Sequence, residues 1–174
     1  MSLRHLVLQA RNNAWANQVL YDAVCGLDDE ALRAPYPSFF GTIPRLLNHI
    51  YEVDLFYLDG IMGGGLGRSV YDRADVVDMA DLARAQAAQD ADLIGYCTGL
   101  TQNMANALCD LERPAEMTRE RVDHTLLHLF QHQVHHRGQV HGMLSQAGAA
   151  PPQLDDFYLD YGRVATAKPY WEES

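Results

Sequence analysis

The sequence predicts an all-α protein, an antiparallel four-helix bundle with a short C-terminal extension. Four long segments repeat apolar residues at spacings of three and four, which is typical of one buried helix face. No segment alternates apolar and polar residues over a useful length, so no strand is expected. The connections between the four segments are modest in length, as they are in helical bundles.

The first helix is expected from Leu3 to near Gly26, where glycine interrupts the apolar pattern. Asp28 is placed to cap a short helical turn that follows. The Pro-Tyr-Pro segment at residues 35–37 then breaks the chain into a connection, because proline and the residue before it disfavour helix.

The second helix is expected from about Thr42, a candidate N-cap, to about Asp59. Pro44 is tolerated there because it lies in the first helical turn. Five glycines between residues 60 and 67 then predict a loop. This loop lacks the Gly-Lys-Ser/Thr ending of a Walker motif, so phosphate binding is not expected.

The third helix is expected to begin at a cap formed by Asp78 or Asp81 and to run as far as Leu111. Pro114 ends it, and a connection from Arg113 to about residue 121 follows.

The fourth helix runs from there to Ala147, and Gly148 is its expected stop. The aromatic-rich tail that follows is expected to pack as a short helix or an extended piece. A chain of 174 residues needs only one domain. We therefore expect a single helical domain, 1–174, with a core of about 1–150 and an extension of 151–174.

The charge balance argues against two classes of partner. Thirteen lysines and arginines face twenty-three aspartates and glutamates, a formal charge of -10. Such a chain repels phosphate backbones and anionic membrane surfaces, so we expect no nucleic acid and no membrane partner.

Polar and charged residues interrupt the N-terminal segment where a signal peptide would be apolar. No uncharged apolar run approaches the roughly 20 residues of a bilayer-spanning helix. The cysteines, Cys25, Cys97 and Cys109, form no CxxC pair, and we interpret them as buried thiols in a reducing compartment. We expect a cytoplasmic protein.

Five of the eight histidines lie between residues 127 and 146, on the fourth helix. Residues four apart on a helix differ by only about 40° around its axis, so His128 with His132, or His132 with His136, can face one ion. A catalytic zinc-type site takes a third protein ligand. The isolated His49 of the second helix is a candidate. Helical spacing assigns no role to His124, His135 or His141, and none to His128 except in its pair with His132.

Three segments resemble the DinB / YfiT-like family of bacterial four-helix-bundle proteins. They are NNAWANQVLYDAV, FFGTIPRLLNHIYEVDLFYL and HLFQHQVHHRGQVHGMLSQAG. The resemblance covers the chain from the first helix to Pro152. It implies a metal site made of one histidine from the second helix and the two of HxxxH in the last, which are His49, His132 and His136 here. It also implies a homodimer associated with stress response.

Other residues take provisional roles from the same resemblance. Trp15 and Asn17 match a WxN element that we interpret as structural. Arg137 and Gln139 belong to an RGQ signature, expected either to pair with neighbouring helices or a partner subunit or to contact substrate. Asp54 fits the pattern HxxxxD. Asp54 and Glu52 are the candidate carboxylate partners of the metal ligands.

Asn48 and Gln139 lie close enough in sequence to support the ligand rings as well. Three neutral imidazoles would hold a divalent ion, most plausibly Zn²⁺ or Ni²⁺, and leave a position open for water or substrate.

Three functions remain open on these residues. The resemblance implies a metal-dependent transferase or isomerase that uses a low-molecular-weight thiol such as mycothiol, bacillithiol or glutathione. A metal-dependent hydrolase would use the same ligands. The third is a stress-associated metal-binding or ligand-binding module without turnover. The substrate and the native metal are not determined by the ligand set.

Overall fold

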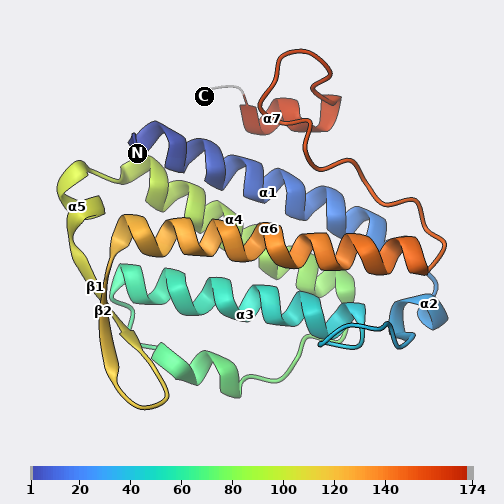
Figure 1. Ribbon diagram of the computed structural model, residues 1–174, viewed down its shortest axis with the longest axis horizontal. Helices are drawn as coiled ribbons and strands as arrows, with labels where there is room; N and C mark the ends of the chain where they lie inside the picture. Colours follow the sequence, from blue (N-terminus) through green and yellow to red (C-terminus); the bar gives the residue numbers. More distant parts are fainter. Residues whose placement is uncertain (1, 172–174) are drawn as a thin grey trace.

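Four long helices form the body of the protein in the computed structural model, which describes residues 2–171 (Figure 1). They are α1 (Leu3–Cys25), α3 (Ile43–Met62), α4 (Met79–Gly99) and α6 (Val122–Gln146). The all-α fold class predicted from the sequence is confirmed.

The closest helix pairs are antiparallel, α1 with α4 and α3 with α6 (Figure 1). α3 and α4 run in the same direction, because the connection between them crosses back along α3 through the 3₁₀ helix η1 (Gly67–Asp72). One long crossover of this kind is a known variation of the four-helix bundle. It brings α3 and α6 side by side.

The predicted starts and stops of the first two long helices are largely confirmed. The Asp28 carboxylate accepts a hydrogen bond from the Ala31 N–H and caps α2 (Asp29–Arg33). Thr42 precedes α3 in extended conformation, although its side chain makes no capping hydrogen bond. α3 continues three residues past the predicted end at Asp59 and stops at Gly63, whose φ of 70° favours glycine.

The third helix was predicted too long, and the prediction of no strand was wrong. α4 ends at Gly99, a short α5 follows (Gln102–Asn106), and β1 (Leu108–Glu112) pairs antiparallel with β2 (Met117–Arg121). Apolar residues in this stretch also match helical spacing, and β1 buries only two of its five residues, too few to reveal the alternation.

The hairpin packs on α3 through one of those two residues. Leu111 is 1% exposed, and a Cβ at Gly60 of α3 would lie 2.4 Å from its Cδ2 atom. The absence of a side chain at Gly60 therefore allows the leucine to approach the helix closely.

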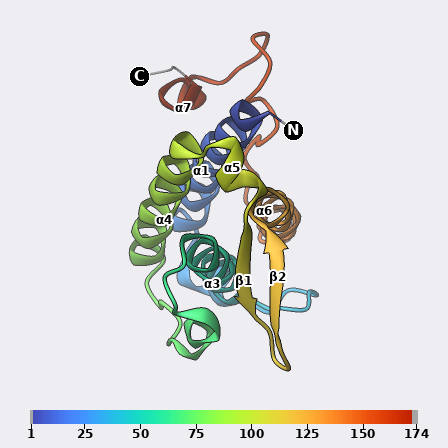
Figure 2. The same ribbon diagram turned by 90° about the vertical axis from the view of Figure 1, so that its left-hand side faces the viewer.

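The C-terminal extension packs on the outer side of α1 (Figures 1 and 2). It contains η2 (Ala165–Ala167) and α7 (Lys168–Trp171), as the expectation of a short helix or an extended piece foresaw. Trp15 is fully buried there, with its ring 5.5 Å from that of Phe157 and its Nε1–H donating to Thr166 Oγ1. This confirms a structural role for Trp15. Residues 172–174 of the predicted extension lie outside the described residues.

Two of the three cysteines are buried, as predicted. Cys97 and Cys109 are 1% and 6% exposed. The prediction was wrong for Cys25, which is exposed at the last position of α1. Its place at the helix end puts it beyond the packed interface.

Removing the Phe157 ring tests how the extension is held. Phe157→Ala is expected to lower the free energy of unfolding by about 3 kcal/mol, because it opens a cavity beside Trp15. The matched control is Tyr161→Ala, since Tyr161 is 95% exposed in the same segment. Chemical denaturation measures both variants, and equal effects would contradict the packing described here.

Candidate metal centre

Three histidines from two antiparallel helices converge on one point. His49 comes from α3, and His132 and His136 come from successive turns of α6. One ring nitrogen of each lies within 4.8 Å of those of the others, and His49 Nε2 is 3.1 Å from His132 Nε2. The structure thus brings together the three residues that the resemblance implied. Such a group could hold a metal ion, and metal binding itself stays a prediction.

The outer nitrogen of His136 has a defined partner. Its Nδ1 lies 2.8 Å from Gln139 Oε1, so this N–H donates to the amide oxygen and leaves Nε2 free to face the other two rings. Gln139 is therefore a support of the ring, as its place in the sequence suggested. His132 Nδ1, by contrast, is buried with no hydrogen-bond partner among residues 2–171.

Burial keeps the three imidazoles neutral. Burial, with a smaller contribution from the neighbouring histidines, lowers the pKa of His49 to about 4 and that of His132 to about 3. Burial also lowers the pKa of His136, against a raising effect of its bond with Gln139. A metal ligand must be deprotonated to donate its lone pair, so near neutral pH the group is ready to bind a cation.

The remaining histidines of α6 do not join this group. His128 is exposed and its ring lies 6.4 Å from that of His132, closer to Tyr57 at 5.1 Å. His124 and His135 are also exposed, and His141 is half-buried beside α1 and the extension. Of the two pairs open from the sequence, the described structure therefore combines His132 with His136 and not with His128.

The two candidate carboxylates lie in different surroundings. Glu52 is half-buried, and burial raises its pKa while Arg73 lowers it. Asp54 is 2% exposed and its Oδ2 accepts from the amides of Gln86 and Gln133. Neither carboxylate hydrogen-bonds to the three histidines among the described residues, so their supporting role stays a prediction.

Asn48 serves the connection after α3 and not a histidine ring. Its amide donates to the carbonyl oxygens of Pro44 and Val76, and its Oδ1 accepts from Arg73 at 3.0 Å. The Arg73 guanidinium also lies 4.8 Å from the ring centre of Tyr51. Arg73 thereby joins the connection after α3 to that helix.

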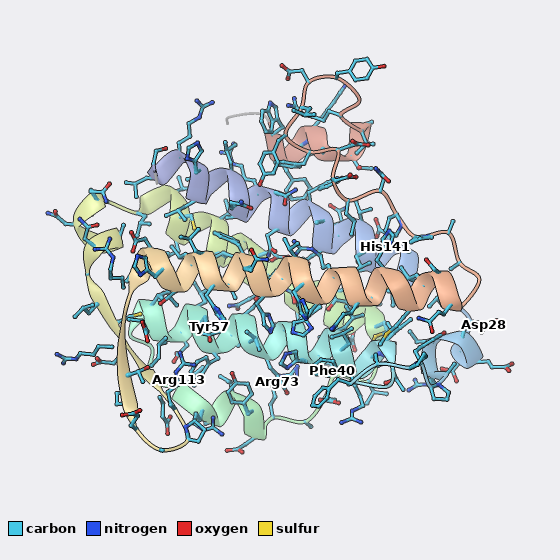
Figure 3. The ribbon with its side chains drawn as sticks, in the orientation of Figure 1. Asp28, Phe40, Tyr57, Arg73, Arg113 and His141 are labelled. Atoms are coloured by element: carbon cyan, nitrogen blue, oxygen red, sulfur yellow. The ribbon has the colours of Figure 1, made fainter. Side chains whose placement is uncertain are left out.

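Phe40 is a site residue that the sequence argument did not single out. Its ring lies 4.6 Å from that of His49 and 5.4 Å from that of His136, and Figure 3 shows it in the connection before α3. It shields one side of the histidine group from water. The only sequence signal was its place in a segment without regular structure, close to the second helix.

A buried polar network lies behind the histidine group and links all four long helices. Arg137 of α6 donates to Asn17 Oδ1 at 2.9 Å and to Gln133 Oε1 at 3.0 Å. Asn17 in turn donates to Asp90 of α4 at 3.0 Å. The network's members are all at most 4% exposed: Asn13, Asn17, Asp54, Gln86, Asp90, Gln133 and Arg137. Of the roles open for Arg137, pairing with a neighbouring helix is the one observed among residues 2–171, and Asn17 is structural as predicted.

Burial shifts every charge in this network toward neutrality. It raises the pKa of Asp54 to about 7 and that of Asp90 to about 6, and it lowers the pKa of Arg137 to about 10. Two carboxyl groups share one guanidinium, so full ionisation would leave an excess negative charge in a dry interior.

Comparison with known proteins gives a consistent result. The model of the DinB family matches residues 1–169. Protein DinB of Bacillus subtilis (strain 168) is 26% identical over 148 residues, which cover 82% of this chain and 86% of that protein. The crystal structure of a DinB-like protein from Bacillus cereus ATCC 10987 superposes with a TM-score of 0.62 at 20% identity, over 80% of this chain and 90% of that chain. The latter likeness shows the shared fold.

The raised pKa of Asp54 predicts a pH dependence of stability. Its folded pKa of about 7 lies above the ordinary value of 3.8. This carboxyl therefore stabilises the fold fully below about pH 4, and the contribution is lost as the pH rises through about 7. Asp54→Asn, which keeps an oxygen for the glutamine amides, should remove that loss.

Urea denaturation at pH values from 4 to 8 measures the effect. Asp92→Asn is the control, because Asp92 is an exposed carboxylate of α4 and its loss changes the net charge equally. Parallel pH profiles for wild type and Asp54→Asn would contradict the assignment.

Proposed function

Because this chain belongs to the DinB family, we propose that it binds a divalent first-row metal ion through His49, His132 and His136 and uses it as an open catalytic site. The single observation that supports this most is the convergence of three neutral ring nitrogens within 4.8 Å. Three imidazoles match the ligands of catalytic zinc sites, and imidazole suits Ni²⁺ equally.

The residues around the ligands fit that use. Gln139 fixes the His136 ring so that Nε2 points inward. Phe40 covers one side with an aromatic face and excludes water there. A bound ion would supply Lewis-acid chemistry, which includes lowering the pKa of a thiol or water in the open position.

A transferase or isomerase that uses a low-molecular-weight thiol is the reaction we favour. A hydrolase generally needs a base to take a proton from water. Among residues 2–171 no carboxylate hydrogen-bonds to the three histidines. Asp54 instead accepts from Gln86 and Gln133, and the charge of Arg73 lowers the pKa of Glu52 against the effect of burial. A thiol is far more acidic than water and depends less on such a base. The hydrolase and the non-catalytic binding module remain the competing proposals.

The proposal includes a homodimer that binds no nucleic acid, in keeping with the formal charge of -10. No helix among residues 2–171 has the length and apolar character required to cross a membrane.

Metal content tests the ligand assignment directly. Purified wild type is expected to carry about one equivalent of a divalent metal by elemental analysis, while His49→Ala, His132→Ala and His136→Ala lose it, because two ligands make a weak site. His124→Ala is the control, since His124 is an exposed histidine of the same helix more than two turns before His132. Metal retained in the three variants, or absent from wild type even after metal is supplied, would refute the site.

The hydrogen bond between His136 and Gln139 predicts a smaller loss of metal affinity than the removal of a ligand does. Gln139→Ala is expected to weaken metal binding by about 10- to 100-fold, because the ring loses the acceptor that orients it. Calorimetric titration with Zn²⁺ measures this, with the exposed Gln131→Ala as control. Equal affinities in the two variants would show that the contact is dispensable.

Turnover separates the three functions. The metal-loaded protein is incubated with mycothiol, bacillithiol or glutathione and 1-chloro-2,4-dinitrobenzene, and separately with p-nitrophenyl acetate. Conjugation that His136→Ala abolishes supports the thiol transferase. Ester hydrolysis alone favours the hydrolase, and neither reaction in a protein that holds its metal favours the binding module.

A further inference from the structure

A cavity lies between α1 and α4, the two long helices that carry none of His49, His132 and His136. Its volume is about 430 Å³, within the range of small-molecule sites. Figure 2 shows these two helices side by side, with α7 next to them and the β hairpin on the opposite side of the bundle. Four alanines give part of its walls a small apolar surface: Ala14, Ala83, Ala87 and Ala91.

Two buried polar atoms of the lining have no partner. Tyr21 is 4% exposed and Gln86 is fully buried, and both line the cavity. Neither the Tyr21 hydroxyl nor Gln86 Oε1 makes a hydrogen bond within residues 2–171. An unmade hydrogen bond in a dry interior costs roughly 1–3 kcal/mol, so each atom calls for a partner outside the protein.

The charge of the lining selects the kind of partner. Two carboxylates line the cavity, those of Asp22 and Asp90, and no lysine, arginine or histidine does. Behind the lining, Asp54 and Asp90 share the single charge of Arg137. A cation in the cavity would balance the excess negative charge of the ionised network.

The C-terminal extension contributes the rim. Tyr170 of α7 lines the cavity and its hydroxyl donates to Gln18 Oε1 of α1. Burial raises the pKa of Tyr170, and the carboxylates of Asp90 and Asp22 add to that rise. The Tyr21 hydroxyl and Gln86 Oε1 are shielded from water. A ligand therefore reaches these two atoms only when neighbouring side chains of the lining move.

We propose that the α1–α4 cavity binds a small molecule with a primary ammonium head and a compact apolar body. An ammonium has three N–H donors. They match the Gln86 carbonyl oxygen, the Tyr21 hydroxyl oxygen and the Asp90 carboxylate, while the body packs on the alanines. The proposal is independent of the histidine group, which lies between the other two helices.

Three probes with the same phenyl body test the head group: phenethylamine, phenethyl alcohol and 3-phenylpropionate. Each is titrated by calorimetry and ligand-detected NMR into the metal-free full chain. We expect saturable binding of phenethylamine at one site, about tenfold or more weaker binding of the alcohol, and none of the acid. No saturable binding of the amine, or equal binding of the acid, would overturn the proposal.

Two neighbouring alanines provide a matched pair of variants. Ala87 lines the cavity and Ala88 does not, and both are exposed on α4. Ala87→Phe is expected to reduce amine affinity at least about tenfold while Ala88→Phe leaves it unchanged. Circular dichroism checks that both fold, and Tyr21→Phe should weaken the amine several-fold. Equal affinities in the two alanine variants would place the amine elsewhere.

Sedimentation of the same variants examines the competing occupant, a second copy of the chain. If the α1–α4 cavity were a subunit interface, wild type would be a dimer and Ala87→Phe a monomer. The amine would then show no saturable binding. That combination refutes the ligand proposal. A common oligomeric state in both variants, with amine binding lost only in Ala87→Phe, supports it.

Discussion

The arrangement of the bundle depends on the hydrogen bonds of one buried group, the guanidinium of Arg137. It donates to side chains of α1 and of α6 itself, and the asparagines of α1 pass the connection on to Asp90 of α4. Gln133 and Gln86 extend it to Asp54 of α3. A buried charge without partners is strongly destabilising, so the four helices satisfy these groups only in one relative orientation. A core made of leucines alone would allow several relative orientations of the helices.

This network sets the rotation of α6 and thereby the position of the histidines. Gln133 and Arg137 each follow a histidine of the triad by one residue, which corresponds to about 100° around the helix axis. When these two side chains point to the centre of the bundle, His132 and His136 point toward α3, where His49 meets them. Packing and the candidate metal centre are thus two consequences of one orientation.

The same network borders the candidate metal centre and the alanine-lined cavity. On the α6 side Gln133 belongs to the helix that carries His132 and His136, and on the α4 side Gln86 and Asp90 reach the cavity. Its two acids face one base. Burial raises the pKa of both carboxyls because it penalises the charged form, and the guanidinium of Arg137 offsets only part of that rise. A cation at either border would relieve that imbalance, and the cavity has the unpartnered acceptors to hold one.

The helices and the two candidate histidine pairs of the fourth helix, His128 with His132 and His132 with His136, followed from the sequence because helical spacing is a local property. The cap at Asp28 and the stop at Gly148 were readable for the same reason. The fold and the choice of His49 were reachable through resemblance. Contacts between distant residues were not, because no local pattern encodes them: Arg137 bonds Asn13, 124 residues earlier, and Phe40 reaches the histidines from a connection. The β hairpin escaped because its short alternation coincides with helical spacing. The sequence by itself therefore determined the helical segments and two candidate histidine pairs. The tertiary structure decided which pair meets His49 and which face of each helix is dry, because both depend on contacts between distant residues.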